Sequence, residues 1–126
     1  MCLYAFVHYK THYVCVTCRV SFKRHNTPGR PQPCARCGEA LRWAGRDFAA
    51  PPRRDARAWS VVAAVLDEGL RYEGRSACGC SREPRYRPRT RAALRARRGA
   101  AERTGLPLAE TLTWPDPSGP APRLDG

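Results

Sequence analysis

With 126 residues and a mass of 14.1 kDa, the chain has room for one compact domain, or for a small domain with a helical extension, and two full domains are excluded. Its 23 Lys and Arg against 11 Asp and Glu give a formal net charge of +12 and a pI near 10.2, which favours a polyanionic partner. Ala, Gly, Pro and Arg are all abundant and only Lys10 and Lys23 are lysines, so the base composition of the genome is an alternative source of this charge.

Residues 1–8 lack the basic start and the A-x-A cleavage site of a secretory signal, and we interpret them as an N-terminal extension, either an added strand or a stretch before the native start. No later stretch reaches the roughly 18 apolar residues needed to span a bilayer. We therefore expect a cytoplasmic location and no membrane association. In that compartment the seven cysteines should be reduced thiols that can hold metal.

Two Cys-x-x-Cys pairs, Cys15 with Cys18 and Cys34 with Cys37, are separated by fifteen residues, which is inside the spacing window of a four-cysteine zinc site. Four thiolates fill the tetrahedral shell of zinc and leave no position for water or substrate, so the predicted zinc is structural. A thioredoxin-type redox pair and an iron site are the alternatives. The three histidines are weaker candidates for replacing a cysteine: His8, His12 and His25.

Residues 9–48 around these cysteines are predicted to form a zinc ribbon. Short strands are expected at residues 13–14, 19–23 and 40–43, and Gly38 follows the second pair where a positive φ is needed. About 40 residues bury too little apolar surface to fold alone, whereas zinc binding contributes on the order of 10 kcal/mol. The metal is therefore expected to drive folding.

A helical extension is expected over residues 49–105. Its first helix begins at a cap on Asp55 and ends at Gly69, with apolar residues at helical spacing: Trp59, Val62, Ala63, Leu66 and Leu70. Apolar residues also occupy the opposite side, so burial on more than one face is expected, and a strand over residues 60–66 is the alternative. A second, basic helix is predicted from a cap on Thr90 to about Arg103.

The second helix should end at Gly105 and Pro107, and its apolar stripe is thin. Residues 106–126 contain few hydrophobic groups and several prolines, so we predict a disordered tail. The predicted fold class is therefore small α+β: a four-cysteine zinc ribbon followed by two α-helices and a disordered tail.

Cys78-Gly-Cys80 is a shorter pair with an open interpretation. It could bind a second metal together with Cys2 or a partner chain, or it could be a redox pair. The simpler interpretation is a tight loop with two unremarkable thiols, since the spacing is too short for a zinc knuckle.

The arginine-rich stretch over residues 85–98 is the best candidate for function. Arg91, Arg95 and Arg98 fall on one helical face, and an anion at the helix N-terminus would meet free N–H groups and guanidinium forks together. A solvated basic helix is the alternative. The predicted nucleic-acid contacts, in which Tyr86 stacks on a base, are Arg85, Tyr86, Arg87, Arg89, Thr90, Arg91, Arg95 and Arg98.

Taken together, the first cysteine pair after Tyr13-Val14, the second pair with Gly38, the 55–69 segment and Tyr86-Arg-Pro-Arg-Thr90 resemble a family of short actinobacterial zinc-ribbon proteins. The resemblance covers about residues 9–105 and implies the architecture, since that family has no established activity. Some relatives carry the name of the thiamine-dependent deoxyxylulose-phosphate synthase. This chain is far too short for a thiamine-diphosphate site, so that name is not expected to apply.

These observations predict a basic zinc-ribbon protein that binds RNA or DNA, or a ribonucleoprotein, as a ribosome- or transcription-associated accessory factor. The alternative is an adaptor whose ribbon and Trp59 helix dock a protein partner. We do not expect an enzyme or a small-molecule substrate, because the cysteine site is closed and the chain shows no paired carboxylates, nucleophile elbow or phosphate loop.

Overall fold

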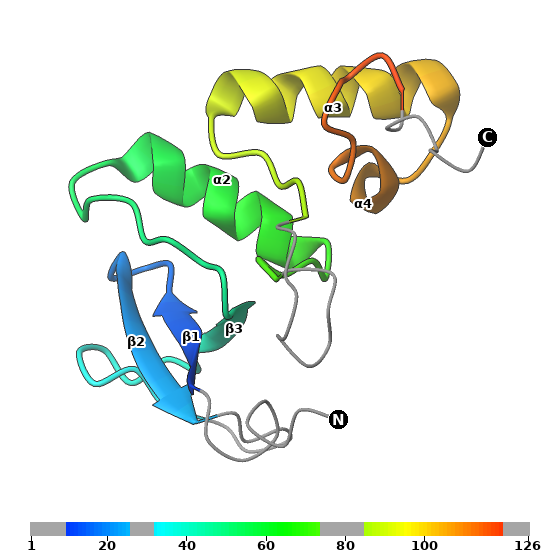
Figure 1. Cartoon of the computed structure of the whole chain (residues 1–126). Helices are drawn as coiled ribbons and strands as arrows, with labels where there is room; N and C mark the ends of the chain where they lie inside the picture. The colour runs from blue at the N-terminus through cyan, green and yellow to red at the C-terminus, as the bar shows by residue number, and fades with distance from the viewer. Residues whose placement is uncertain (1–9, 26–31, 74–84, 120–126) are drawn as a thin grey trace, which may run out of the picture.

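The computed structural model describes residues 10–25, 32–73 and 85–119, and it shows a small α+β fold (Figure 1). A three-stranded antiparallel sheet is followed by three helices within these residues. The elements are β1 (Lys10–Cys15), β2 (Val20–His25), β3 (Arg42–Gly45), α2 (Ala56–Asp67), α3 (Arg91–Thr104) and α4 (Leu108–Thr111).

The sheet has the order β2-β1-β3, so the first strand lies in the middle. Strand β1 pairs with β2 in a hairpin that brings Cys15 opposite Val20, and with β3 in a register that brings Tyr13 opposite Trp43. Tyr13 and Val14 are buried, as expected for the central strand of a small sheet. The predicted strands are therefore present, with bounds shifted by a few residues.

Helix α2 forms where the sequence predicts it, and the strand alternative is wrong. The side chain of Asp55 accepts a hydrogen bond from the N–H of Ala58 at 3.0 Å, and Gly69 takes a φ of +80° just after the helix end. Five residues on more than one face of the helix are buried: Trp59, Val61, Val62, Val65 and Leu66. The prediction of burial on several faces is confirmed.

One hydrophobic core joins the sheet to the helices. It contains Val14, Ala44 and Phe48 from the sheet region, the buried side of α2, and Tyr72, Leu94 and Leu112 from later in the chain. Figure 1 shows α2 lying between the sheet and α3. The residues predicted as ribbon and as helical extension therefore share a single core.

The segment after α2 returns to the sheet and fixes the end of β3. Tyr72 donates its N–H to the carbonyl of Ala44 at 2.7 Å and accepts from the N–H of Asp47 at 2.8 Å. This close approach requires glycine at position 45, because a Cβ there would lie 2.5 Å from the carbonyl oxygen of Tyr72 and φ is +102°. Residues 70–73 are thereby held against the sheet.

Helix α3 begins and ends at the predicted residues. Thr90 accepts from the N–H of Ala93 at 3.1 Å, and Gly105 closes the helix in the left-handed conformation. The buried side of the helix is formed by Leu94, Arg97 and Ala100. Arg97 therefore adds to the buried side of a helix whose sequence shows only a thin apolar stripe.

The prediction of a disordered tail is wrong for residues 106–119. Helix α4 lies against α3, Thr111 and Leu112 are fully buried, and Trp114 is 5% exposed. Proline limits regular hydrogen bonding, but it does not prevent packing when large apolar side chains such as Leu112 and Trp114 find a core. Residues 120–126 lie outside the described residues.

Candidate metal centre

The two Cys-x-x-Cys turns meet at one point. The sulfur atoms of Cys15, Cys18, Cys34 and Cys37 all lie within 4.8 Å of one another, and all four cysteines are free thiols. The Sγ atoms of Cys15 and Cys37, from different turns, are 3.6 Å apart. A tetrahedral shell with metal–sulfur bonds of about 2.3 Å has sulfur–sulfur edges of about 3.8 Å. The four side chains therefore lie close enough together to hold a single metal ion.

Each turn is shaped by backbone N–H groups that point at sulfur. The N–H of Cys18 donates to the Sγ of Cys15 at 3.4 Å, and the N–H of Arg36 donates to the Sγ of Cys34 at 3.3 Å. The residue after each pair has a positive φ, +57° at Arg19 and +81° at Gly38. The expectation for Gly38 is confirmed, and Arg19 takes the same conformation without being glycine.

The second turn is the tip of a short hairpin. Cys34 donates its N–H to the carbonyl of Glu39 at 2.7 Å, and Leu41 donates to the carbonyl of Gln32 at 2.7 Å. These bonds fix the turn that carries Cys34 and Cys37, whose sulfur atoms lie near those of the first pair.

Two further contacts fix the position of the turns. The hydroxyl of Thr17 in the first turn donates to the carboxylate of Glu39 in the second at 2.9 Å. The Arg53 side chain, just before α2, donates to the carbonyl of Cys18 at 3.2 Å. The cysteine cluster is therefore tied both to itself and to the helical part of the fold.

The thiols differ in their readiness to ionise. The N–H of Arg36 lowers the pKa of Cys34 to about 7, because it stabilises the thiolate. Hydrogen bonding to Cys37 raises the pKa of Cys18 to about 12, and burial raises the pKa of Cys15. Four thiolates this close repel one another, so a cation at their centre is needed to ionise all of them.

The histidines do not join the cluster within the described residues. The ring of His12 packs on Phe48 with centroids 5.9 Å apart, and burial together with Lys23 lowers the His12 pKa. His25 lies exposed at the end of β2. His8, Cys2, Cys78 and Cys80 lie outside the described residues.

Most of the arginines predicted to contact nucleic acid are exposed. Arg91, Arg95 and Arg98 form an exposed row on α3, which we call the arginine row, opposite the buried Leu94. Within the described part of the chain no carboxylate forms an ion pair with these three. Arg85 and Arg89 are exposed on the segment leading to the helix, and Thr90 caps it.

Arg87 differs from that expectation because its side chain points inward. It is 9% exposed, and its guanidinium donates to the carbonyls of Arg71 at 2.9 Å and Tyr86 at 2.8 Å. Burial lowers the Arg87 pKa. The ring of Tyr86 lies under the guanidinium of Arg97, 4.7 Å from its centroid, so one face of the ring is already covered.

The sequence pattern does not predict two features of the structure. Arg97 is 5% exposed and anchors the segment after α4, and the only signal for this is its position within the apolar stripe of α3, three residues after Leu94. A groove between β3 and the end of α2 brings Trp43 against Arg71, which are too far apart in sequence to be paired by spacing.

None of the described helices is long and apolar enough to cross a bilayer. Comparisons of the chain with protein-family models, with curated proteins and with solved structures find no match. The resemblance to actinobacterial zinc-ribbon proteins therefore stays a prediction.

Proposed function

We propose that this protein is a zinc-ribbon protein that binds nucleic acid, alone or within a ribonucleoprotein, and that its arginine row contacts phosphates. The observation that carries the proposal is the row itself. Three arginines lie on one exposed face of α3 without carboxylate partners in the described residues, in a chain of net charge +12. Exposed, unpaired guanidinium groups are the donors that bind phosphate best.

Zinc is the metal that best suits the cysteine cluster. A set of four thiolates with no open position is typical of structural zinc, although the same donors can hold iron. Cys15 is the last residue of β1, and the carbonyl of Cys18 accepts a hydrogen bond from Arg53 before α2. The metal would therefore stabilise the sheet and the start of the helical part together. The expected role of the zinc is structural, with no position for a reacting water.

The geometry of α3 matches a nucleic-acid backbone. From Arg91 to Arg98 the helix advances about 10 Å, which corresponds to about three phosphate spacings of one strand, measured along the axis of a duplex. The N-terminus of α3 adds the positive end of the helix dipole beside Arg89 and Thr90. These features together favour contacts to phosphate over contacts to base edges, so we expect weak sequence preference.

The adaptor alternative receives less support. Trp59 is 2% exposed, and its indole N–H donates to the carbonyl of Pro52, so this side chain is not offered to a partner. Among the described residues the one large hydrophobic side chain that is exposed is Leu106. A protein-docking surface usually presents a wider apolar patch.

The test compares two matched pairs of substitutions in the full chain. Changing Arg95 and Arg98 together to Gln should lower affinity and reduce the slope of log affinity against log salt by up to about 1.8 on duplex DNA, or about 1.4 on a single strand. Metal content and circular dichroism should not change, because both side chains are exposed.

The control pair changes Arg54 and Arg57 to Gln, which removes the same charge from exposed positions at the start of α2. Its effect should be clearly smaller. Equal losses from both pairs would show that net charge alone drives binding, and no binding by the unmodified protein would move the assignment to the protein adaptor.

A further inference from the structure

A groove of about 280 Å³ lies where β3, the C-terminal end of α2 and the segment after α2 meet. This volume is just below the usual range for ligand sites and suits a single ring system. The groove is lined by Arg42, Trp43, Leu66, Gly69, Leu70 and Arg71.

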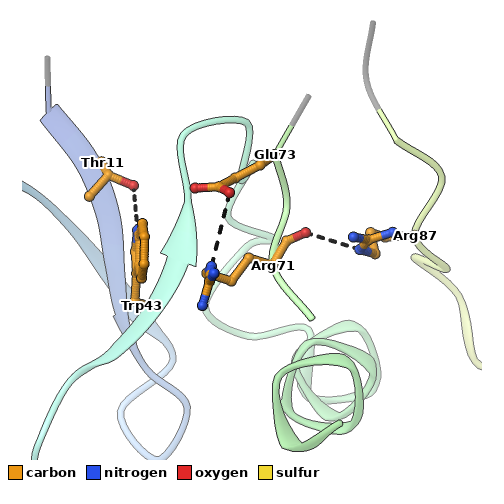
Figure 2. Close-up of polar contacts among 5 residues, drawn as sticks. All are labelled: Thr11, Trp43, Arg71, Glu73 and Arg87. Atoms are coloured by element: carbon orange, nitrogen blue, oxygen red, sulfur yellow. Dashed lines mark hydrogen bonds and ion pairs between the residues drawn. The ribbon is translucent and has the colours of Figure 1, made fainter. Parts of the chain in front are cut away.

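One wall of the groove is a stacked pair. The guanidinium carbon of Arg71 lies 4.0 Å from the centroid of the Trp43 ring, and Figure 2 shows the side chain of Arg71 pointing toward the indole. The indole N–H donates to the hydroxyl of the buried Thr11 at 2.9 Å, and the Arg71 Nε lies 4.0 Å from a Glu73 carboxylate oxygen. The Arg71 side chain is still 43% exposed. The guanidinium is therefore positioned by its stacking on Trp43 and by the nearby Glu73 carboxylate, while part of the side chain remains accessible to solvent.

Each arginine of the groove has a carboxylate nearby. Arg42 forms an ion pair with Asp67 at 2.8 Å, and Arg71 is paired with Glu73. Leu66 and Leu70 supply an apolar lining. A phosphate would gain little in such a place, whereas a flat, uncharged ring can stack on a guanidinium plane and cover the leucines.

The groove adjoins the arginine-rich segment. As Figure 2 shows, the carbonyl of Arg71 points away from Trp43 and accepts a hydrogen bond from Arg87 at 2.9 Å. The next residue, Tyr72, lies under the guanidinium of Arg89, 5.2 Å from its centroid. A strand with one base in the groove would thus have the exposed Arg89 nearby for a phosphate.

We propose that this groove holds one unpaired nucleobase of a single-stranded nucleic acid, stacked on the Arg71 guanidinium that Trp43 supports. The inference rests on the proposed function and adds a preference for single strands. The charge of +12 and the exposed Arg89 on the adjoining segment favour a nucleobase over an aromatic side chain of a protein partner.

The test is Arg71→Lys in the full chain, which keeps the charge and removes the planar group. The probes are a mixed-sequence single strand and a duplex of the same length. Single-strand affinity should fall roughly 5-fold or more, the low end of the contribution of one stacked base, while the salt slope and the duplex affinity stay unchanged. Arg57→Lys, on the exposed side of α2, is the control and should change neither.

Tryptophan emission gives an independent measurement. The single strand should quench the emission of the unmodified protein, and Trp43→Phe should remove most of that quenching although Trp59 and Trp114 remain. If Arg71→Lys leaves single-strand affinity unchanged, or lowers single-strand and duplex affinity equally, the groove proposal is overturned. The effect of the Arg95 and Arg98 pair on duplex binding would then still decide the proposed function separately.

Discussion

Arg97 and Trp114, seventeen residues apart in sequence, are joined by two hydrogen bonds: the Nε and Nη2 of Arg97 donate to the Trp114 carbonyl oxygen at 3.2 and 3.0 Å. A further bond from Nη2 reaches the carbonyl of Pro115 at 2.8 Å. Both side chains are 5% exposed. One arginine of the basic helix therefore serves the fold, because it satisfies backbone carbonyls that no helix or strand partner reaches.

We expect Arg97→Met to destabilise the protein by roughly 2 to 4 kcal/mol, because buried carbonyl oxygens lose charged donors while the apolar stem is retained. Urea unfolding measures this change. Arg98→Met, on the exposed face of the same helix, is the matched control and should change the free energy of unfolding by no more than about 0.5 kcal/mol. Equal effects would mean that Arg97 is not an anchor.

Leu112→Ala should cost about 2 to 5 kcal/mol of unfolding free energy, since the side chain is fully buried in the common core. Leu106→Ala removes the same atoms from a side chain that is 41% exposed and should cost far less. Thermal unfolding of the two variants compares them directly. A neutral Leu112→Ala would restore the disordered-tail prediction.

Substitutions at the positive-φ residues of the two cysteine turns should change the stability in opposite directions. Arg19→Gly should stabilise the protein by about 0.5 kcal/mol, because relief of left-handed strain outweighs the added freedom of the unfolded chain. Gly38→Ala should destabilise it by about 1 kcal/mol through backbone strain alone, as no atom lies within 4 Å of the new methyl group. Chemical denaturation of the metal-loaded protein measures both. The same sign for both variants would contradict the assignment of strain.

Loss of metal should unfold the sheet. Cys34→Ser is expected to abolish tight binding of one zinc ion, measured by elemental analysis, together with the near-ultraviolet circular dichroism of the core. The effect should spread beyond the turns, because Val14 next to Cys15 belongs to the common core. Cys78→Ser should hold as much metal as the unmodified protein, and a lower metal content in that variant would favour the second-site alternative for Cys78 and Cys80.

Tyr72 predicts a loss of stability at alkaline pH. Burial raises its pKa to about 12 from an ordinary value near 10. Between these two pH values the unfolded chain releases a proton that the native state keeps. The contribution of the neutral Tyr72 to the free energy of unfolding is therefore fully present below pH 10. It falls as pH rises, by up to roughly 2 to 3 kcal/mol at pH 12. Comparison of unfolding of the unmodified protein and Tyr72→Phe at pH 8 and 11.5 isolates this contribution, which should be absent in Tyr72→Phe.

Features set by neighbours in sequence were predictable. The spacing of four cysteines predicts their cluster, and caps at Asp55 and Thr90 with glycines at 69 and 105 predict where α2 and α3 begin and end. The caps and the closing glycines depend on residues within one turn of the chain, and the cysteine cluster depends on the repeated Cys-x-x-Cys spacing of two pairs that are fifteen residues apart. Such patterns of residue type and spacing can be read from a single sequence without knowledge of the tertiary contacts.

Features set by tertiary contacts were not predictable. Arg87 and Arg89 are equivalent by pattern, yet one is buried on the Arg71 carbonyl and the other is exposed, because only the path of residues 71–73 decides which carbonyl meets which guanidinium. The tail was misjudged for the same reason. The tail is poor in apolar residues on average, but Leu112 is buried in the core and Trp114 is buried as well.

The position of Leu112 in the core has a consequence for synthesis of the protein. Val14 leaves the ribosome early and its core partner Leu112 nearly a hundred residues later, although both lie in one cluster. The cysteine turns are complete once residue 37 has emerged, so metal can bind to a nascent chain whose core is still open. Until Leu112 arrives, apolar surface on α2 stays exposed. During that interval a metal ion bound at the cysteine turns would help to hold the nascent chain in its native arrangement while the core is still incomplete.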